Sequence, residues 1–251
     1  MQDLTPNMPS ADAGVRRVQQ FESPAGVPTL STQQLVTADG ELNAELNHFM
    51  FDPPLNPSLL KGKRIAICCT NGVEEIEVLG ARRWLSEHGA TVHLVCPKAT
   101  QMPAAYGVRM PPLAETHVLT VRLLENAGWL PIDAYVDQVT AADYDAVILP
   151  GGCWNPDFLR ADKHALAFVK AMDAAKKPVC GICHGPWVMI SAGILRGRKA
   201  TAVWNIQIDV ANAGATVFDQ PVVVDDHIIT ARFPYDLPRM IAALTEQLLA
   251  V

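Results

Sequence analysis

Apolar and polar positions follow two different patterns along this chain, and the change comes at about residue 61. Residues 1–60 carry seven prolines among scattered polar residues, with little periodic apolar content. Such a segment does not supply a hydrophobic core. We therefore predict an N-terminal arm over residues 1–60 and a folded domain over residues 61–251. Near the end of the arm, the apolar stretch Phe49-Met50-Phe51 packs either on the domain or on another subunit.

From Lys63 onward, short apolar runs of strand length alternate with stretches that have a helical spacing of apolar residues. Arg64–Cys69 is typical of a buried strand, and Glu74–His88 places Ile76, Leu79, Trp84 and Leu85 on one helix face before the helix-ending Gly89. The further predicted strands are 91–97, 145–149, 178–180, 201–203, 222–224 and 228–230, and the further predicted helices are 162–176, one from Pro186, 206–213 and 237–249.

The segment 110–132 interrupts this alternation. Within it, His117–Asn126 predicts a helix that ends before Gly128. A helical insertion of this kind is either surface decoration or a lid or oligomer contact.

Alternating strands and helices favour an α/β fold with a mostly parallel sheet covered by helices on both faces. Ligands of such sheets bind beyond the carboxyl ends of the strands. Gly151-Gly152 and Cys183 both follow predicted strands. We therefore expect them to meet at one edge of the sheet.

The run Gly181-Ile182-Cys183-His184-Gly185-Pro186 predicts a strand, a sharp turn and a helix, with a cysteine at the turn. Glycines on both sides permit tight backbone angles, and Pro186 suits the first turn of a helix. The helix N-terminus is expected to favour the thiolate of Cys183, which is the nucleophilic form. This geometry is a nucleophile elbow built around cysteine. The alternative is a buried structural cysteine in a glycine-rich turn.

Four segments together resemble the ThiJ/PfpI superfamily, in its order and over about residues 62–250. They are the elbow, Ala146–Gly152, Gly72–Glu77 and Ile229–Pro238. Cys-His-Gly-Pro at the elbow is similar to the PfpI-like peptidase and deglycase branch. The resemblance implies a flavodoxin-like fold and a catalytic domain over 61–251.

The resemblance also implies roles for particular residues. Glu77 matches a glutamate that approaches the cysteine, although an acidic residue at a helix start is favoured by the helix dipole in any case. Asp157 matches an acidic residue that orients His184 from a neighbouring subunit, which implies a homo-oligomer; as an ordinary residue it would be a cap or turn residue. The backbone N–H groups of Gly152 and His184 are the expected oxyanion donors.

Composition limits the remaining possibilities. A formal charge of −6 and the lack of a basic patch argue against nucleic-acid binding. The sequence contains neither an apolar run long enough for a membrane span nor a secretory signal, so a cytoplasmic protein without a membrane partner is expected. The seven histidines lack metal-ligand spacing, so neither a metal nor another cofactor is predicted. Among the six cysteines, Cys180 and Cys183 form a CxxC whose side chains should face apart, and Cys153 is a candidate redox neighbour or a free thiol.

These grounds leave two functions open and disfavour a third. The first is an enzyme with Cys183 as nucleophile on a carbonyl group of a small molecule or peptide: an amide, a glycated group or a small ketoaldehyde such as methylglyoxal. The second is a stress-response chaperone or redox sensor with an oxidisable cysteine. A glutamine amidotransferase is disfavoured, because after Cys183 the histidines are His184 and His227, and neither begins a His-x-Glu pair.

Overall fold

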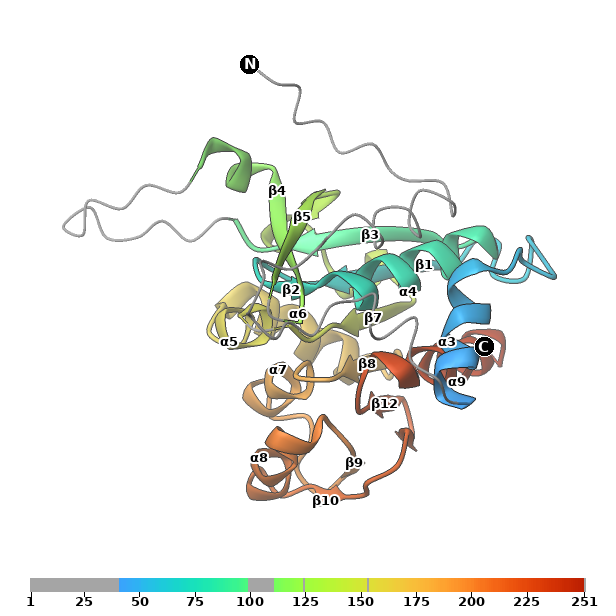
Figure 1. Ribbon diagram of the computed structural model, residues 1–251. Coiled ribbons are helices and arrows are strands. Elements are labelled where there is room, and N and C mark those ends of the chain that lie inside the picture. The colour runs from blue at the N-terminus through green and yellow to red at the C-terminus, as the bar shows by residue number, and fades with distance from the viewer. Residues whose placement is uncertain (1–40, 99–110, 124, 153, 251) are drawn as a thin grey trace, which may run out of the picture.

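The computed structural model describes residues 41–98, 111–123, 125–152 and 154–250 (Figure 1). Its main sheet has seven strands in the order β11–β12–β8–β7–β1–β3–β6. All neighbours pair in parallel except β11, which is antiparallel to β12. The strands are β1 Arg64–Cys68, β3 Thr91–Cys96, β6 Ala134–Tyr135, β7 Ala146–Leu149, β8 Val179–Ile182, β11 Val222–Asp225 and β12 Ile228–Ala231. The predicted mostly parallel α/β sheet is confirmed.

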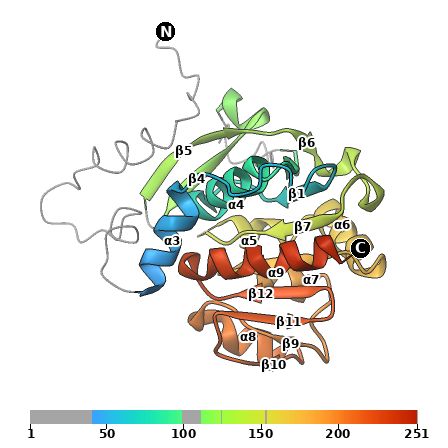
Figure 2. The same ribbon diagram turned by 90° about the vertical axis from the view of Figure 1, so that its right-hand side faces the viewer.

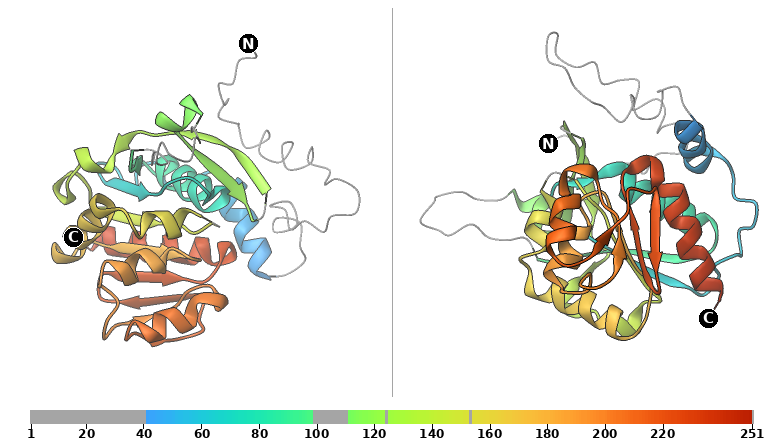
Figure 3. Two further views of the ribbon diagram at one scale, coloured as in Figure 1. Left: turned by 90° about the vertical axis from the view of Figure 1, so that its left-hand side faces the viewer. Right: turned by 90° about the horizontal axis from the view of Figure 1, so that it is seen from below.

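Helices cover both faces of this sheet. On one face, α4 (Glu75–Glu87) packs beside α9 (Leu237–Leu249), as Figure 2 shows. On the opposite face lie α6 (Lys163–Ala174) and α7 (Pro186–Ser191), with α5 (Asn155–Leu159) against α7 (Figure 3). This sandwich explains why every residue of β7, β8 and β12 is buried.

Local sequence signals account for the helix positions. Asp162 begins α6 by accepting hydrogen bonds from the backbone N–H groups of His164 and Ala165, at 2.9 and 2.8 Å. Helix α9 buries apolar residues at helical spacing, among them Met240, Ile241 and Leu244. None of the helices in the described ranges is both long and apolar enough to cross a membrane.

Shorter elements surround the main sheet. Strands β2 (Val73–Glu74), β4 (His117–Arg122) and β5 (Glu125–Pro131) form a three-stranded sheet, and β9 (Lys199–Ala200) pairs with β10 (Thr216–Val217). The remaining elements are α8 Gln207–Asn212 and the 3-10 helices η2 Pro112–Glu115, η3 Val136–Gln138, η4 Ala141–Asp143, η5 Trp204–Ile206 and η6 Pro234–Asp236.

The predicted helical insertion is wrong. Instead of a helix over His117–Asn126, β4 and β5 form an antiparallel hairpin, and β4 pairs with β2 beside the main sheet. The alternation of β-branched residues explains the difference, because Val118 and Thr120 are both buried on β4. Gly128 lies inside β5, where its backbone exchanges hydrogen bonds with the Thr120 hydroxyl at 3.0 and 3.1 Å.

The strand predicted over 201–203 is displaced. The chain pairs with β10 at Lys199–Ala200 and then leaves the ladder. Its next backbone N–H, that of Thr201, donates instead to the Thr230 hydroxyl on β12 at 2.8 Å. This side-chain bond replaces a strand partner, which apolar patterning does not reveal.

The last part of the predicted arm forms a helix, contrary to the prediction of an arm without regular structure. Helix α3 (Glu41–Phe51) packs against α4 and α9, and its Leu46 is fully buried. Phe49 stacks on Trp84 with ring centroids 6.0 Å apart. Leu46, Phe49 and Met50 have the i, i+3, i+4 spacing of one helix face. Of the two packing alternatives for this stretch, the structure shows contact with the domain for Phe49; residues 1–40 lie outside the described ranges.

Candidate active site

Cys183 lies at the point where β8 ends and the chain turns toward α7. Its φ is +60°, a left-handed conformation that few residues other than glycine adopt. Both of its backbone groups are held. The N–H donates to the carbonyl of Ala231 on β12, and the carbonyl accepts from the N–H of Val203, each at 3.1 Å. The strained turn is thus fixed by strand β12 and by the segment before η5, as expected of a nucleophile elbow.

The turn Pro150-Gly151-Gly152, after β7, lies directly against the elbow. A Cβ added to Gly151 would be 2.7 Å from the Cβ of Cys183 and 3.1 Å from its sulfur, so a side chain does not fit there. Gly152 has a φ of +104°. The backbone N–H groups of Gly152 and His184 both lie close enough to the Cys183 sulfur to lower its pKa. The two expected oxyanion donors therefore converge on one atom.

Glu77 reaches this turn from the first turn of α4. Its side chain is fully buried, and its Oε2 accepts a hydrogen bond from the N–H of Gly151 at 2.5 Å. Burial raises the pKa of Glu77 to about 7, whereas the Gly151 amide and the neighbouring Cys183 thiol lower it. Complementing a helix dipole does not require a buried carboxyl. Glu77 therefore differs from an ordinary helix-start residue, because its carboxyl lies beside the cysteine with a pKa close to neutral.

The thiol of Cys183 differs from the expectation. Burial raises its pKa well above the ordinary value, and the charges of Glu77 and Glu74 raise it further. The amides of His184 and Gly152 act in the opposite direction. Burial prevails because Cys183 is only 7% exposed and α7 is a short helix of six residues. Formation of the thiolate is thus favoured by a neighbouring group that accepts the thiol proton. It is also favoured by neutralisation of Glu77 or Glu74, whose charges raise the thiol pKa.

His184 contacts Cys183 within one chain. Its Nδ1 lies 3.3 Å from the sulfur, and its Nε2 lies 3.2 Å from Nδ2 of Asn205 on η5. The edge of the ring packs on Trp187, with centroids 5.3 Å apart. Burial lowers the pKa of His184. Asn205 was missed, because its position follows from the bond between Val203 and Cys183, which leaves no mark on the sequence.

Asp157 is placed apart from this group. It is exposed on α5, between the exposed aromatic residues Trp154 and Phe158. Within the chain, the Nε2 of His184 is met by Asn205 rather than by a carboxylate. The role of Asp157 across a subunit interface remains a prediction.

Further acidic groups at the start of α4 are tied to the β4–β5 hairpin. Glu75 forms a buried ion pair with Arg122 at 2.6 Å, and Oε2 of Glu74 accepts from the N–H of Leu123 at 2.9 Å. Burial, followed by the charge of Glu77, raises the pKa of Glu74 to about 8. The insertion thus anchors the backbone segment that carries Glu77.

The other cysteines that the structure describes lie in the core. Cys180 is fully buried within β8, and burial raises the pKa of its thiol. Cys69 and Cys96 touch through their sulfur atoms at 3.9 Å, and both are buried. Cys153, the candidate redox neighbour, lies outside the described residues. Within the described ranges, no three metal-ligating side chains gather into a possible metal site.

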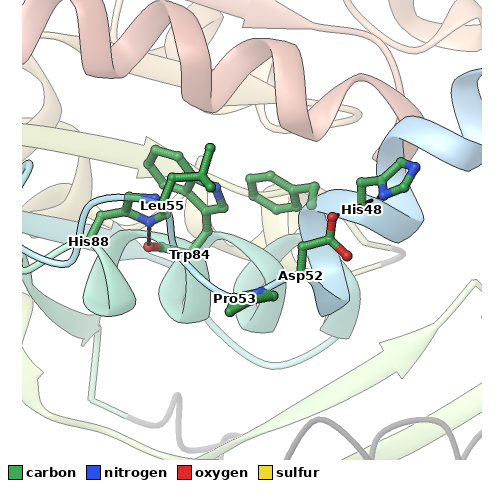
Figure 4. A pocket seen from close by; sticks show the side chains of 7 residues that line it. His48, Asp52, Pro53, Leu55, Trp84 and His88 are labelled. Carbon is green, nitrogen blue, oxygen red and sulfur yellow. Dashed lines mark hydrogen bonds and ion pairs between the residues drawn. The ribbon is translucent and has the colours of Figure 1, made fainter.

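A cavity of about 490 Å³ lies at the opposite end of α4, between that helix and α3 (Figure 4). Trp84 stacks on His88 there, with centroids 3.7 Å apart, and Nδ1 of His88 lies 2.7 Å from the carbonyl oxygen of Trp84. Trp84 is seven residues from Glu77, or about 10 Å along the helix axis. This cavity is therefore separate from the cysteine. Its lining residues are His48, Phe49, Asp52, Pro53, Leu55, Trp84 and His88.

Comparison with known proteins agrees with this geometry. The family model described as DJ-1/PfpI matches residues 63–247. "Protein/nucleic acid deglycase 2" of Escherichia coli K12 is 49% identical over 120 residues, which is 47% of this chain and 69% of that protein. "General stress protein 18" of Bacillus subtilis 168 is 46% identical over 120 residues, with the same coverage of 47% and 69%.

Among solved structures, a two-domain protein from Anabaena variabilis with DJ-1/ThiJ/PfpI-like and ferritin-like domains is similar to this chain. The TM-score is 0.64, with 28% sequence identity, over 74% of this chain. The match covers 48% of that protein, so this chain spans about half of its length.

Proposed function

The chain belongs to the DJ-1/PfpI family, and from that premise we propose that it is an enzyme in which Cys183 attacks a carbonyl carbon of a small ketoaldehyde or of a glycated group. The observation that carries the proposal is the convergence on one sulfur atom of a buried carboxyl, an imidazole and two backbone N–H groups. The deglycase among the relatives supports this substrate class. The 7% exposure of Cys183 favours a small substrate over a folded polypeptide.

The first step moves one proton and forms one bond. Glu77 takes the thiol proton as the sulfur attacks, which suits a carboxyl whose pKa is about 7. A carbon–sulfur bond forms, and the π electrons of the carbonyl move to its oxygen. The N–H groups of Gly152 and His184 already point to the sulfur, and a carbonyl carbon bound there brings its oxygen within their reach. The oxygen then takes the proton back from Glu77, which leaves a neutral addition product bound to Cys183 through its sulfur and Glu77 again as a carboxylate.

A turnover assay with matched thiol variants tests the proposal. The substrates are methylglyoxal, a methylglyoxal-treated N-acetylarginine and an unmodified peptide, each with the wild type, Cys183→Ala and Cys180→Ala. We expect the first two substrates to be consumed by the wild type and by Cys180→Ala, whose thiol is fully buried within β8. Cys183→Ala should be inactive. Equal rates for wild type and Cys183→Ala would refute the proposal. Cleavage of the peptide alone would show that the substrates are peptides and not ketoaldehydes or glycated groups.

A redox-sensing role is the second candidate, and the name of the Bacillus subtilis relative, a general stress protein, favours it. In that case peroxide would oxidise Cys183 to a sulfenic acid, with loss of water, and no substrate would turn over. Mass spectrometry after stoichiometric peroxide, beside the turnover assay, separates the two candidates.

A further inference from the structure

We propose that Asn205 fixes the tautomer of His184 with the proton on Nδ1, so that His184 donates a hydrogen bond to the Cys183 sulfur and does not act as the base for its thiol. The role in catalysis rests on the proposed function, because it presumes that Cys183 is the nucleophile. The tautomer itself does not depend on it. It follows from two contacts, one at each ring nitrogen.

The first step of the argument is the chemistry of the amide. A neutral imidazole has one nitrogen that donates and one that accepts. The atom of Asn205 that faces the ring is Nδ2, which can only donate, at 3.2 Å from Nε2. Nε2 must then accept, and the ring proton belongs on Nδ1. Nδ1 lies 3.3 Å from the sulfur, within reach of a hydrogen bond to sulfur.

The second step is that the ring is held in place. Trp187 packs against it at 5.3 Å between centroids, and the indole N–H of Trp187 donates to Asp209 on α8 at 2.8 Å. Arg160 lies over the Trp187 ring, 5.4 Å from its centroid. The tryptophan is thereby held by both Asp209 and Arg160. A fixed ring edge limits rotation of His184 and keeps each nitrogen with its partner.

The third step concerns the charged groups around His184. The elbow contributes Cys183, α4 contributes Glu77, with Glu74 close to the sulfur, and α8 contributes Asp209. The carboxyl of Asp209 accepts a hydrogen bond from the indole N–H of Trp187, and the carboxyl of Glu77 accepts one from the N–H of Gly151. Within the chain, the group that meets Nε2 is a neutral amide. A neutral imidazole is favoured by this arrangement, and its partial burial acts in the same direction. A carboxylate of Asp157 from a second subunit at the same nitrogen would instead place the proton on Nε2, so the two assignments exclude each other.

These contacts divide the work between two residues. His184 already carries a proton at the nitrogen that faces sulfur, so it cannot accept another there. Glu77 is buried beside the same sulfur, and its Oε1 has no hydrogen-bond partner of ordinary geometry among the described residues. Glu77 is then the base for the thiol, and His184 stabilises the thiolate that results. Asn205 is the positioning residue for this division.

The tautomer is measured directly by ¹⁵N NMR of the full-length protein labelled at histidine. The His184 signals are identified by their loss in His184→Gln. We expect the pattern of a protonated Nδ1 and a bare Nε2 in the wild type near neutral pH. A protonated Nε2 in the wild type would overturn the proposal. No substrate enters this measurement, so a failure of the proposed function and a failure of this inference remain distinguishable.

Asn205→Asp supplies the opposite test, because both carboxylate oxygens only accept. The proton should move to Nε2, and the pKa of His184 should rise by about one, since an adjacent negative charge favours the imidazolium. The rate of Cys183 alkylation against pH should then gain a limb at the pKa of His184. Asn212→Asp, which adds the same charge at the exposed far end of α8, should leave both readouts as in the wild type. An unchanged tautomer and pKa in Asn205→Asp would also overturn the proposal.

Discussion

Replacing Glu77 by glutamine separates the two roles open to this buried carboxyl. Glutamine keeps an oxygen that can accept from the Gly151 N–H, so the turn beside Cys183 is retained. It removes the ionisable group. A residue that only begins a helix would lose a few tenths of a kcal/mol to about 1 kcal/mol of stability and leave the chemistry unchanged.

The structure predicts instead that Glu77→Gln increases the free energy of unfolding at neutral and higher pH. The pKa of Glu77 rises from 4.5 to about 7 on folding, chiefly through burial. Between these two pKa values, the folded state binds more protons than the unfolded state. The contribution of Glu77 to stability is therefore complete below pH 4.5 and is lost as the pH rises to 7. The difference between the two pKa values corresponds to about 3 kcal/mol. Glu77→Gln should therefore match the wild type near pH 4 and exceed it by up to about 3 kcal/mol at pH 8.

Turnover should change in the other direction. Without a base for the thiol, we expect a loss of about 100-fold or more. The apparent pKa of Cys183 should fall, because the charge of Glu77 is one of the causes that raise it. Urea unfolding at pH 4 and pH 8 gives the stability difference, and the pH dependence of iodoacetamide alkylation gives the thiol pKa. Glu74 remains in both proteins, but the charge of Glu77 is one of the causes that raise its pKa. In Glu77→Gln the pKa of Glu74 should therefore fall, which adds to the variant's gain in stability near pH 8. Superimposable alkylation curves with unchanged turnover would refute the reasoning.

Three further predictions follow from the packing. Limited iodoacetamide treatment near neutral pH should modify Cys183 before the other thiols, as peptide mapping would show; preferential labelling of Cys153 with Cys183 inert would contradict the proposed nucleophile. Gly151→Ala should slow this alkylation by about 10–100-fold with an unchanged circular dichroism spectrum, because the added Cβ displaces the side chain of Cys183, and an unchanged rate would show that the turn can move aside. Leu46→Ala should cost about 2–5 kcal/mol in urea unfolding, whereas a loss near zero would mean that α3 is only loosely attached.

The framework of the fold could be predicted from the sequence because its signals are local. Buried runs such as Ala146–Leu149 have apolar residues at every position, and α9 repeats them at helical spacing. The hairpin at His117–Pro131 was mistaken for a helix because Leu, Val and Thr fit both periods over so short a span. Its strand character depends on pairing with β2, where Val73 is the partner of Thr120, 47 residues later in the chain.

The candidate site shows the same division between local and distant causes. Glycine and proline at the elbow predict where Cys183 lies, and the resemblance adds Glu77. The contact between His184 and Cys183 depends on the φ of +60° at the cysteine, and the partner of His184 depends on a loop that the main sheet brings alongside. The pKa of the thiol was misjudged because burial cannot be weighed against a helix terminus until the depth of the side chain is known.

The packing of α3 on α4 moves the beginning of the folding unit toward the N-terminus. Similarity to the family begins at residue 63, yet a Cβ on Gly80 would be 2.8 Å from the sulfur of Met50 and 2.9 Å from Leu237, so α3, α4 and α9 share one interior. Gly80 is less than one helical turn from Glu77. Helix α4, which places Glu77 beside Cys183, is thus packed against α3, a segment that precedes the region matched by the family model. The folding unit therefore begins before the region that the family model matches, and changes in α3 can alter the position of Glu77 without changing a residue of that region.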